Sequence, residues 1–301
     1  LNIFMKIFDC FMYFDEDLIL DLRLNYLDKY VDYFVVVESK FNHNGERREP
    51  CFNINKFEKF KEKIIYLLVD DVGNNFHKIH EQDDKNKVAG KNLMNAVIRE
   101  NYQRNFIING LSKAEDEDWI IISDLDEIPN LEVNNLKDSK NKFVFFNQLM
   151  IYYKLNLYLQ DFPWVGSKAC KKKYLKSPQW LRNIKDRIYP WWRLDILFSE
   201  KKFSDIKLYQ NGGWHFSYIK NPKDIEKKLK SYLHHTEYEL NPIGSSKISE
   251  LIRERKTVYN LKVDMRSNKF QEGNLLQKLN MNLLPSYVNE NLDKYLEWIE
   301  K

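Results

Sequence analysis

Three carboxylates follow a short apolar run in the middle of the chain. Trp119–Ile122 is hydrophobic, Asp124, Asp126 and Glu127 come after it, and Pro129 ends any regular structure. Such a run is typical of a buried strand, and the carboxyl ends of strands are where open α/β sheets bind ligands. Mg²⁺ and Mn²⁺ bind carboxylate oxygens and share their shell with substrate phosphates. The pattern predicts a metal site for a nucleotide diphosphate; the alternative is an acidic loop that caps a helix.

A glycine pair next to a tryptophan and a histidine is the second chemical candidate. The segment Gly212–His215 has two residues without a β-carbon, so its backbone can closely approach another group. A neutral imidazole beside carboxylates suits Mn²⁺. We therefore expect His215 to lie close to Asp124 and Asp126. The alternative is a histidine buried beside Trp214 and bonded to a backbone carbonyl.

The elements that would position these residues alternate between strands and helices in the first half of the chain. Apolar runs predict strands and i+4 spacing predicts helices, in the order strand Lys6–Tyr13, helix Glu16–Lys29, strand Tyr33–Glu38, strand Lys63–Val69, helix Lys91–Asn109 and then the Trp119 strand. This order predicts a parallel β/α sheet in which carboxylates close two strands. No Gly-rich phosphate fingerprint is present.

The second half mixes expected β structure, aromatic loops and helices. We predict strands at Lys142–Leu149, Ile151–Leu159, Arg193–Phe198 and Lys207–Tyr209, and helices from Pro222 to His235, Ser246–Tyr259 and Tyr287–Ile299. The aromatic and basic stretch 161–192 is expected to be loop-rich and to hold an acceptor site. The predicted organisation is a catalytic domain over 1–220, with a nucleotide-binding half (about 1–130) and an acceptor half (about 131–220), and a helical region over 221–301 packed on it.

Composition excludes several classes of protein. The 301 residues are 43% hydrophobic and carry 48 basic against 44 acidic side chains, which indicates a globular chain without the charge of a nucleic-acid binder. Lys171–Lys173 and Lys227–Lys228 favour a solvated surface and leave peripheral membrane contact open. Three cysteines in no metal-binding spacing favour a reducing compartment. No apolar run reaches the ~18 residues of a membrane span, so we expect a cytoplasmic protein without a transmembrane segment.

Together these blocks resemble glycosyltransferase family 17, which includes the enzyme that adds the bisecting β-1,4-linked N-acetylglucosamine to N-glycans. The resemblance rests on the stretch Phe14–Gly45, on Arg104, on the block Ser123–Pro129, on Gly213–Ser217 and on the charged helices through Tyr259. It implies a GT-A fold, a UDP-sugar donor, a divalent metal and inversion at the anomeric carbon. We expect the chain to differ from the Golgi members by lacking their membrane anchor and stem.

Residue roles follow from this resemblance and from the chemistry of sugar transfer. We expect Asp126 to hold the metal with Asp124 on metal or ribose, His215 to add a ligand, and Glu38 and Arg104 to contact the nucleotide. Inversion needs a general base, for which the candidates Glu127, Asp161, Asp195 and Glu38 stay open.

Two other functions stay open at this point. A nucleotidyltransferase also uses paired aspartates, but it needs triphosphate-binding residues near the first strand, and Lys6–Asp15 offers none. A carbohydrate-binding module would use the aromatic residues without turnover.

Overall fold

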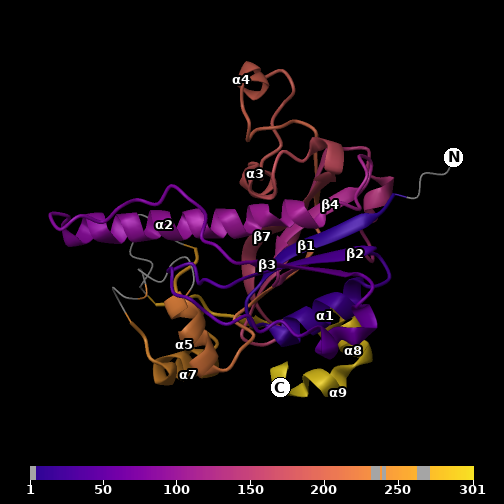
Figure 1. Cartoon of the computed structure of the whole chain (residues 1–301). Coiled ribbons are helices and arrows are strands. Elements are labelled where there is room, and N and C mark those ends of the chain that lie inside the picture. Colours follow the sequence, from indigo (N-terminus) through magenta and orange to yellow (C-terminus); the bar gives the residue numbers. More distant parts are fainter. Residues whose placement is uncertain (1–4, 232–237, 239–241, 263–271) are drawn as a thin grey trace.

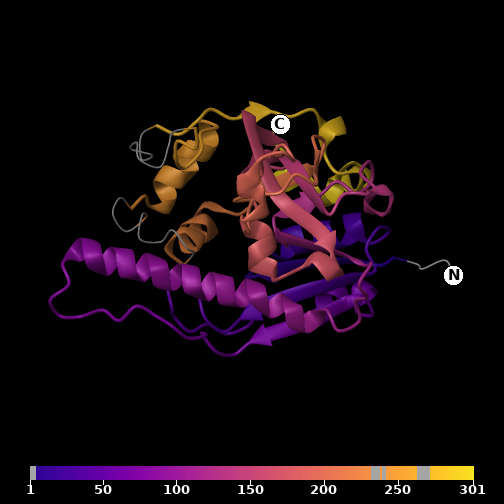
Figure 2. The same cartoon turned by 90° about the horizontal axis from the view of Figure 1, so that it is seen from above.

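One mixed β-sheet runs through the molecule. The computed structural model describes residues 5–231, 238, 242–262 and 272–301. Within them the strands follow one another across the sheet in the order β3 (Ile64–Val69), β2 (Tyr33–Ser39), β1 (Ile7–Tyr13), β4 (Trp119–Asp124), β7 (Leu157–Lys171), β6 (Phe143–Tyr152), β9 (Gly213–Ser217) and β5 (Glu127–Pro129), with β10 (Gln277–Lys278) on β7 and β8 (Ile206–Tyr209) on β6. Helices cover both faces: α1 (Asp17–Leu27), α8 (Ser286–Glu290) and α9 (Leu292–Tyr295) lie on one side, and α2 (Lys85–Asn105) and α3 (Pro178–Asn183) on the other (Figures 1 and 2). The expected α/β class is confirmed, and the architecture is consistent with a GT-A-like fold.

The first half of the sheet is parallel, as the sequence predicts. Its strands are β1 (Ile7–Tyr13), β2 (Tyr33–Ser39), β3 (Ile64–Val69) and β4 (Trp119–Asp124). All neighbouring pairs among them run parallel, so their carboxyl ends meet at one edge. The helices of this half are α1 (Asp17–Leu27) and α2 (Lys85–Asn105), which begins six residues earlier than expected.

The second half pairs back onto β4. Its elements are β5 (Glu127–Pro129), β6 (Phe143–Tyr152), β7 (Leu157–Lys171), α3 (Pro178–Asn183), α4 (Leu194–Leu197), β8 (Ile206–Tyr209) and β9 (Gly213–Ser217). β7 is long enough to run antiparallel to both β4 and β6. The start of the stretch expected to be loop-rich is therefore strand, and the expected strand Arg193–Phe198 is the short helix α4.

The C-terminal region is helical but more broken than expected. It contains α5 (Pro222–Ser231), α7 (Ser245–Arg253), the short strand β10 (Gln277–Lys278), α8 (Ser286–Glu290) and α9 (Leu292–Tyr295). The predicted end of the first helix, at His235, lies outside the described residues. No helix in the described ranges has the length and apolar character needed to cross a bilayer.

Two apolar layers sandwich the sheet. Alternate residues of one strand point to opposite faces, so Ile121 joins the cluster beneath α1 while Ile120 and Ile122 join the cluster beneath α2. Val288 of α8 belongs to the first layer and ties the chain's last helices to the sheet. Each fully buried large side chain contributes about 1.5–3 kcal/mol relative to an exposed one. Because both layers press on β4, the end of that strand is held rigidly.

Candidate functional site

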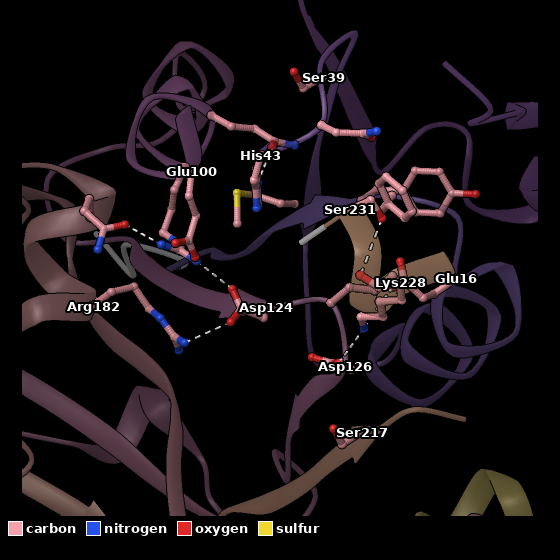
Figure 3. Close-up of a pocket in the computed structure, with 18 of the residues that line it drawn as sticks. Glu16, Ser39, His43, Glu100, Asp124, Asp126, Arg182, Ser217, Lys228 and Ser231 are labelled. Carbon is pink, nitrogen blue, oxygen red and sulfur yellow. Dashed lines mark hydrogen bonds and ion pairs between the residues drawn. The ribbon is translucent and has the colours of Figure 1, made fainter. Parts of the chain in front are cut away.

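A cavity of about 560 Å³ opens at the carboxyl ends of β1, β2 and β4. Its walls come from segments distant in sequence: the ends of these strands, the loop after β2, α2, α3, β9 and α5 (Figure 3). Four acidic and four basic side chains line it: Glu16, Glu100, Asp124 and Asp126, and Arg48, Arg104, Arg182 and Lys228. The position is the one that the strand order predicts for a ligand site.

Asp124 stands at the end of β4 between two arginines. Its Oδ1 accepts a hydrogen bond from Nη2 of Arg104 on α2 at 2.9 Å, and its Oδ2 accepts one from Nη2 of Arg182 on α3 at 3.2 Å. Burial alone would raise the pKa of this carboxyl, but the Arg182 and Arg104 charges outweigh it and hold the pKa well below its usual range. Both oxygens of Asp124 are therefore paired within the protein.

Asp126 has different partners. Its Oδ1 lies 3.6 Å from Nε2 of His215, and its Oδ2 lies 3.4 Å from the ammonium of Lys228 on α5. The juxtaposition with His215, expected from the sequence, comes from backbone pairing: β5 runs antiparallel to β9, and the Phe216 N–H donates to the Asp126 carbonyl at 2.7 Å. Asp126 thus faces an imidazole nitrogen on one side and an ammonium group on the other.

Glycines make this pairing sterically feasible. Gly213 has a φ of +121°, and a β-carbon there would collide with the carbonyl oxygen of Ile128 in β5. A β-carbon on Gly212 would meet the backbone of Asn147. The close approach that the glycine pair predicts therefore occurs, but it is an approach to neighbouring strands. The glycines allow β9 to deliver His215 to Asp126.

Glu127 is a buried structural partner of the arginines. Its carboxylate accepts from Nη1 of Arg182 at 2.7 Å, from the Trp164 indole N–H at 2.8 Å and from the Asp124 backbone N–H at 2.9 Å. The side chain is fully buried and does not line the cavity. Its hydrogen bonds close the turn between β4 and β5, which fixes the directions of Asp124 and Asp126.

The other proposed bases also lie outside the cavity. Asp161 is an exposed residue of β7 with a φ of +57°. Asp195 is exposed on α4, where Arg193 and Lys202 pair with it and lower the pKa of its carboxyl to about 2. Neither lines the cavity. The structure thus brings none of the four base candidates from the sequence, Glu38 included, to the cavity wall.

Glu38 supports the cavity from behind. Its carboxylate accepts from the backbone N–H groups of Cys51 (2.7 Å) and Phe52 (3.1 Å) and from the Tyr66 hydroxyl (2.9 Å), and it pairs with Arg48 at 3.2 Å. It is fully buried and does not line the cavity, whereas Arg48 does. Glu38 therefore fastens the loop after β2 and presents the Arg48 guanidinium.

Arg23 is an important residue that the sequence analysis missed. It is fully buried on α1 and pairs with Asp9 of β1 through hydrogen bonds of 2.6 and 2.7 Å. Its Nη1 also donates to the carbonyl oxygens of Asp124, Leu125 and Glu127 at 2.8–3.1 Å. One guanidinium thus anchors the backbone of the acidic turn. The sequence signal that could have identified Arg23 was its place on the apolar face of a helix.

Two more missed residues form an ion-pair group beside Asp126. Lys228 lies 3.1 Å from Glu16, and Glu16 also lies 3.7 Å from Lys220. Burial would raise the pKa of Glu16, but the two ammonium groups lower it to about 2. Glu16 therefore stays ionised and holds Lys228 next to Asp126. Lys228 was noted in the sequence only as part of a basic run.

The loop after β2 and helix α2 form the opposite wall. Nε2 of His43 lies 3.2 Å from Oε1 of Gln103, and the Gln103 amide donates to the Val37 carbonyl. Burial lowers the pKa of His43, so this imidazole stays neutral at neutral pH. Glu100, one turn earlier on α2, pairs with Arg104 at 2.8 Å.

The carboxylates and histidines of the cavity allow one pair of metal ligands. Among the described residues no group of three His, Cys, Asp or Glu side chains is arranged to hold a metal, so Asp124, Asp126 and His215 do not form a three-ligand cluster. Two ligands at right angles, each about 2.1 Å from one ion, lie about 3 Å apart, close to the 3.6 Å that separates Asp126 and His215. This pair fits a cation that takes its remaining oxygens from a diphosphate.

A comparison with protein families identifies the kind of chain. The sequence model described as Glycosyltransferase family 17 matches residues 2–298, which is essentially the whole chain. No curated protein matches it.

Proposed function

The chain belongs to glycosyltransferase family 17, and from this premise we propose that it moves N-acetylglucosamine from UDP-N-acetylglucosamine to a hydroxyl group of a glycan, with inversion and with a divalent cation. The family's activity is glycosyl transfer; the sugar, the acceptor, the inversion and the metal are our proposals. The observation that carries the metal and the diphosphate is the pair Asp126–His215 in a cavity lined by four protein cations, whereas the sugar, the acceptor and the inversion are proposed from the family.

Donor binding follows from the shape and charge of the cavity. Its volume of about 560 Å³ lies within the range of small-molecule sites. We place the nucleoside between the loop after β2 and α2, where His43 and Gln103 offer polar edges, and the diphosphate toward Asp126. Arg48 and Lys228 then supply positive charge to the phosphates, while Arg104 and Arg182 remain engaged with Asp124.

A divalent cation held by Asp126 and His215 would neutralise charge on the leaving diphosphate. The protein's own contribution is to keep these two ligands in place through the β5–β9 pairing and the Arg23 anchor. Lys228 adds a second positive charge beside the other oxygen of Asp126. These groups act on the charge that develops as the bond to the sugar breaks, which is where electrostatic stabilisation is most effective.

The transfer itself requires a proton acceptor. The acceptor oxygen forms a bond to the anomeric carbon, the bond from that carbon to the diphosphate oxygen breaks, UDP leaves, and the hydroxyl proton passes to a base. Glu16 is a poor base, because Lys228 and Lys220 lower its pKa to about 2. Glu100 is the remaining cavity carboxylate outside the acidic turn, so we propose Glu100 as the base.

Calorimetric titration of UDP with and without Mn²⁺ tests the metal part of the proposal. We expect Mn²⁺ to tighten UDP binding to the wild-type protein and to have little effect on Asp126→Asn. Equal UDP affinity with and without Mn²⁺, together with sugar transfer that survives EDTA, would contradict the proposed role of the metal. The donor is tested by incubation with several UDP-sugars and an oligosaccharide acceptor, and the anomeric coupling of the product reports inversion.

The products of the donor incubation separate the alternatives. A nucleotidyltransferase would consume a nucleoside triphosphate and release pyrophosphate, whereas the proposed reaction releases UDP. A carbohydrate-binding protein would bind glycans without consuming any donor. Neither alternative has support comparable to the family match over residues 2–298.

A further inference from the structure

The segment between α3 and β8 exposes an unusual concentration of apolar side chains. Of the fourteen exposed large hydrophobic residues in the described part of the chain, five fall between positions 188 and 198. They are Ile188 (52% exposed), Trp191 (82%), Trp192 (66%), Leu194 (74%) and Phe198 (90%). Single exposed apolar residues are ordinary, but five of them within eleven positions of the chain indicate an interaction surface. We call residues 185–202 the arm.

The arm is built into the fold at its base. The Lys185 N–H donates to the Lys201 carbonyl at 2.8 Å, and this hydrogen bond joins the beginning of the arm to its end. The Trp180 indole N–H donates to the Glu200 carbonyl at 2.8 Å, and the Phe203 ring packs on Phe143 of the sheet. The base is therefore anchored to the core, while the tip around α4 stands away from the body (Figure 1). The exposed side chains belong to an ordered projection.

Basic residues alternate with the apolar ones. Positions 185–202 contain five Lys or Arg and three Asp or Glu, a net charge of +2 (5 − 3). The acids are all paired: Asp195 with Arg193 and Lys202, Asp186 with Lys168 of β7, and Glu200 with Lys176. Arg187 and Lys201 are exposed on the arm. The tip therefore presents aromatic and aliphatic groups within a positive surround.

This combination fits the surface of an anionic bilayer. Trp is enriched at the boundary between headgroups and acyl chains, and Lys or Arg near an anionic surface is attracted to it. A second copy of the chain fits less well, because a stable interface buries at least about 1,200 Å² and needs a broad complementary face. The tip is a single short helix with its flanking loops and offers no such face.

We propose that the arm docks the protein on anionic membranes, with Trp191, Trp192 and Phe198 inserted at the headgroup boundary and Arg187 and Lys201 on the lipid phosphates. This proposal does not depend on the proposed sugar transfer. The arm leaves the body directly after α3, whose Arg182 lines the cavity, so docking would hold the cavity near the bilayer. The basic run Lys171–Lys173 does not supply this surface, because Lys171 and Lys173 pair with Glu117.

Vesicle co-sedimentation of the full chain tests the proposal. We expect binding to phosphatidylcholine vesicles that contain phosphatidylglycerol, weaker binding to phosphatidylcholine alone, and a loss of at least about 10-fold for the triple variant Trp191→Ser/Trp192→Ser/Phe198→Ser. The matched control Ile79→Ser/Val133→Ser/Leu283→Ser removes exposed apolar groups elsewhere and should bind within about 2-fold of wild type.

Three outcomes would overturn the proposal. The first is that the wild-type chain binds neither vesicle. The second is that the triple variant binds as well as wild type and has an unchanged melting temperature. The third is that light scattering shows a dimer for the wild-type chain and a monomer for the triple variant. The last would assign the tip to a second copy. Arg187→Gln/Lys201→Gln, which leaves the apolar tip intact, should reduce the preference for phosphatidylglycerol; an unchanged preference also contradicts the charge part of the argument.

Discussion

Asp124 and Asp126 are separated by one residue, yet they occupy opposite electrostatic settings. Asp124 ends a buried strand and gives both oxygens to Arg104 and Arg182. Asp126 lies in the following turn, where its oxygens face the His215 imidazole and the Lys228 ammonium at 3.4–3.6 Å. Both carboxylates line the cavity, but the first is held by two arginines at 2.9–3.2 Å, whereas the partners of the second lie farther away (Figure 3).

This difference shows that the two aspartates of one acidic motif can have different roles. The arginines on Asp124 come from α2 and α3, so this carboxylate joins two helices to the end of β4. Asp126 has no bidentate partner, and the longer distances to His215 and Lys228 leave it able to accept a new ligand. We therefore expect Asp124 to act mainly on architecture and Asp126 mainly on chemistry. Four predictions test this division, beginning with the largest effect.

Replacing Asp126 by Asn should lower kcat by roughly a thousand-fold, because a group that stabilises charge in the transition state is lost. The unfolding free energy should stay within about 1 kcal/mol of wild type, since the side chain has no tight partner. Initial rates and urea unfolding measure the two quantities. Full activity in this variant would assign the chemistry elsewhere.

Replacing Arg182 by Met should reduce the unfolding free energy by about 3 kcal/mol, because it removes the guanidinium that neutralises the buried Glu127 carboxylate. The matched control is Arg193→Met, which removes a solvent-accessible pair with Asp195 and should leave the urea midpoint nearly unchanged. Urea unfolding of both variants gives the comparison. Equal losses of unfolding free energy in the two variants would contradict a structural role for Arg182.

Replacing His215 by Ala should weaken Mn²⁺ binding by about 10-fold, because a ligand nitrogen is removed. Asp124→Asn should change Mn²⁺ affinity by less than about 3-fold, since its oxygens already bind arginines. Calorimetry with Mn²⁺ and UDP measures both. The division between the two aspartates fails if Asp124→Asn has the larger effect on metal binding.

The acid stability of the protein should depend on Glu16, which holds Lys228 at Asp126. The pKa of Glu16 is lowered from 4.5 to about 2, so its stabilisation is complete above pH 4.5 and is lost as the pH falls through about 2. We expect Glu16→Gln to remove about 1 kcal/mol at neutral pH and to flatten the fall in stability between those values. Thermal unfolding across this range tests it; parallel curves for the two proteins would contradict it.

Much of the fold was predictable because it depends on local pattern. The apolar runs of β1 to β4 and the i+4 spacing of α1 and α2 reflect burial of single elements, and the structure confirms them. Predictions were wrong where short segments carry ambiguous patterns. Arg193–Phe198 was expected to be a strand and contains helix α4, whose Leu194 is 74% exposed, so burial of this residue could not identify the element. Tyr287–Ile299 was expected to be one helix and is broken at Asn291.

The sequence by itself determined where the acidic turn stands, because a buried strand followed by carboxylates defines the binding edge of a parallel sheet. It also pointed to His215, through glycines that only a close backbone approach requires. The tertiary structure alone decided which partners each carboxylate has. Arg182 and Lys228 reach the turn from 58 and 102 residues away. Such contacts depend on how α3 and α5 pack against the sheet, and helix packing sets side-chain directions that no local spacing encodes.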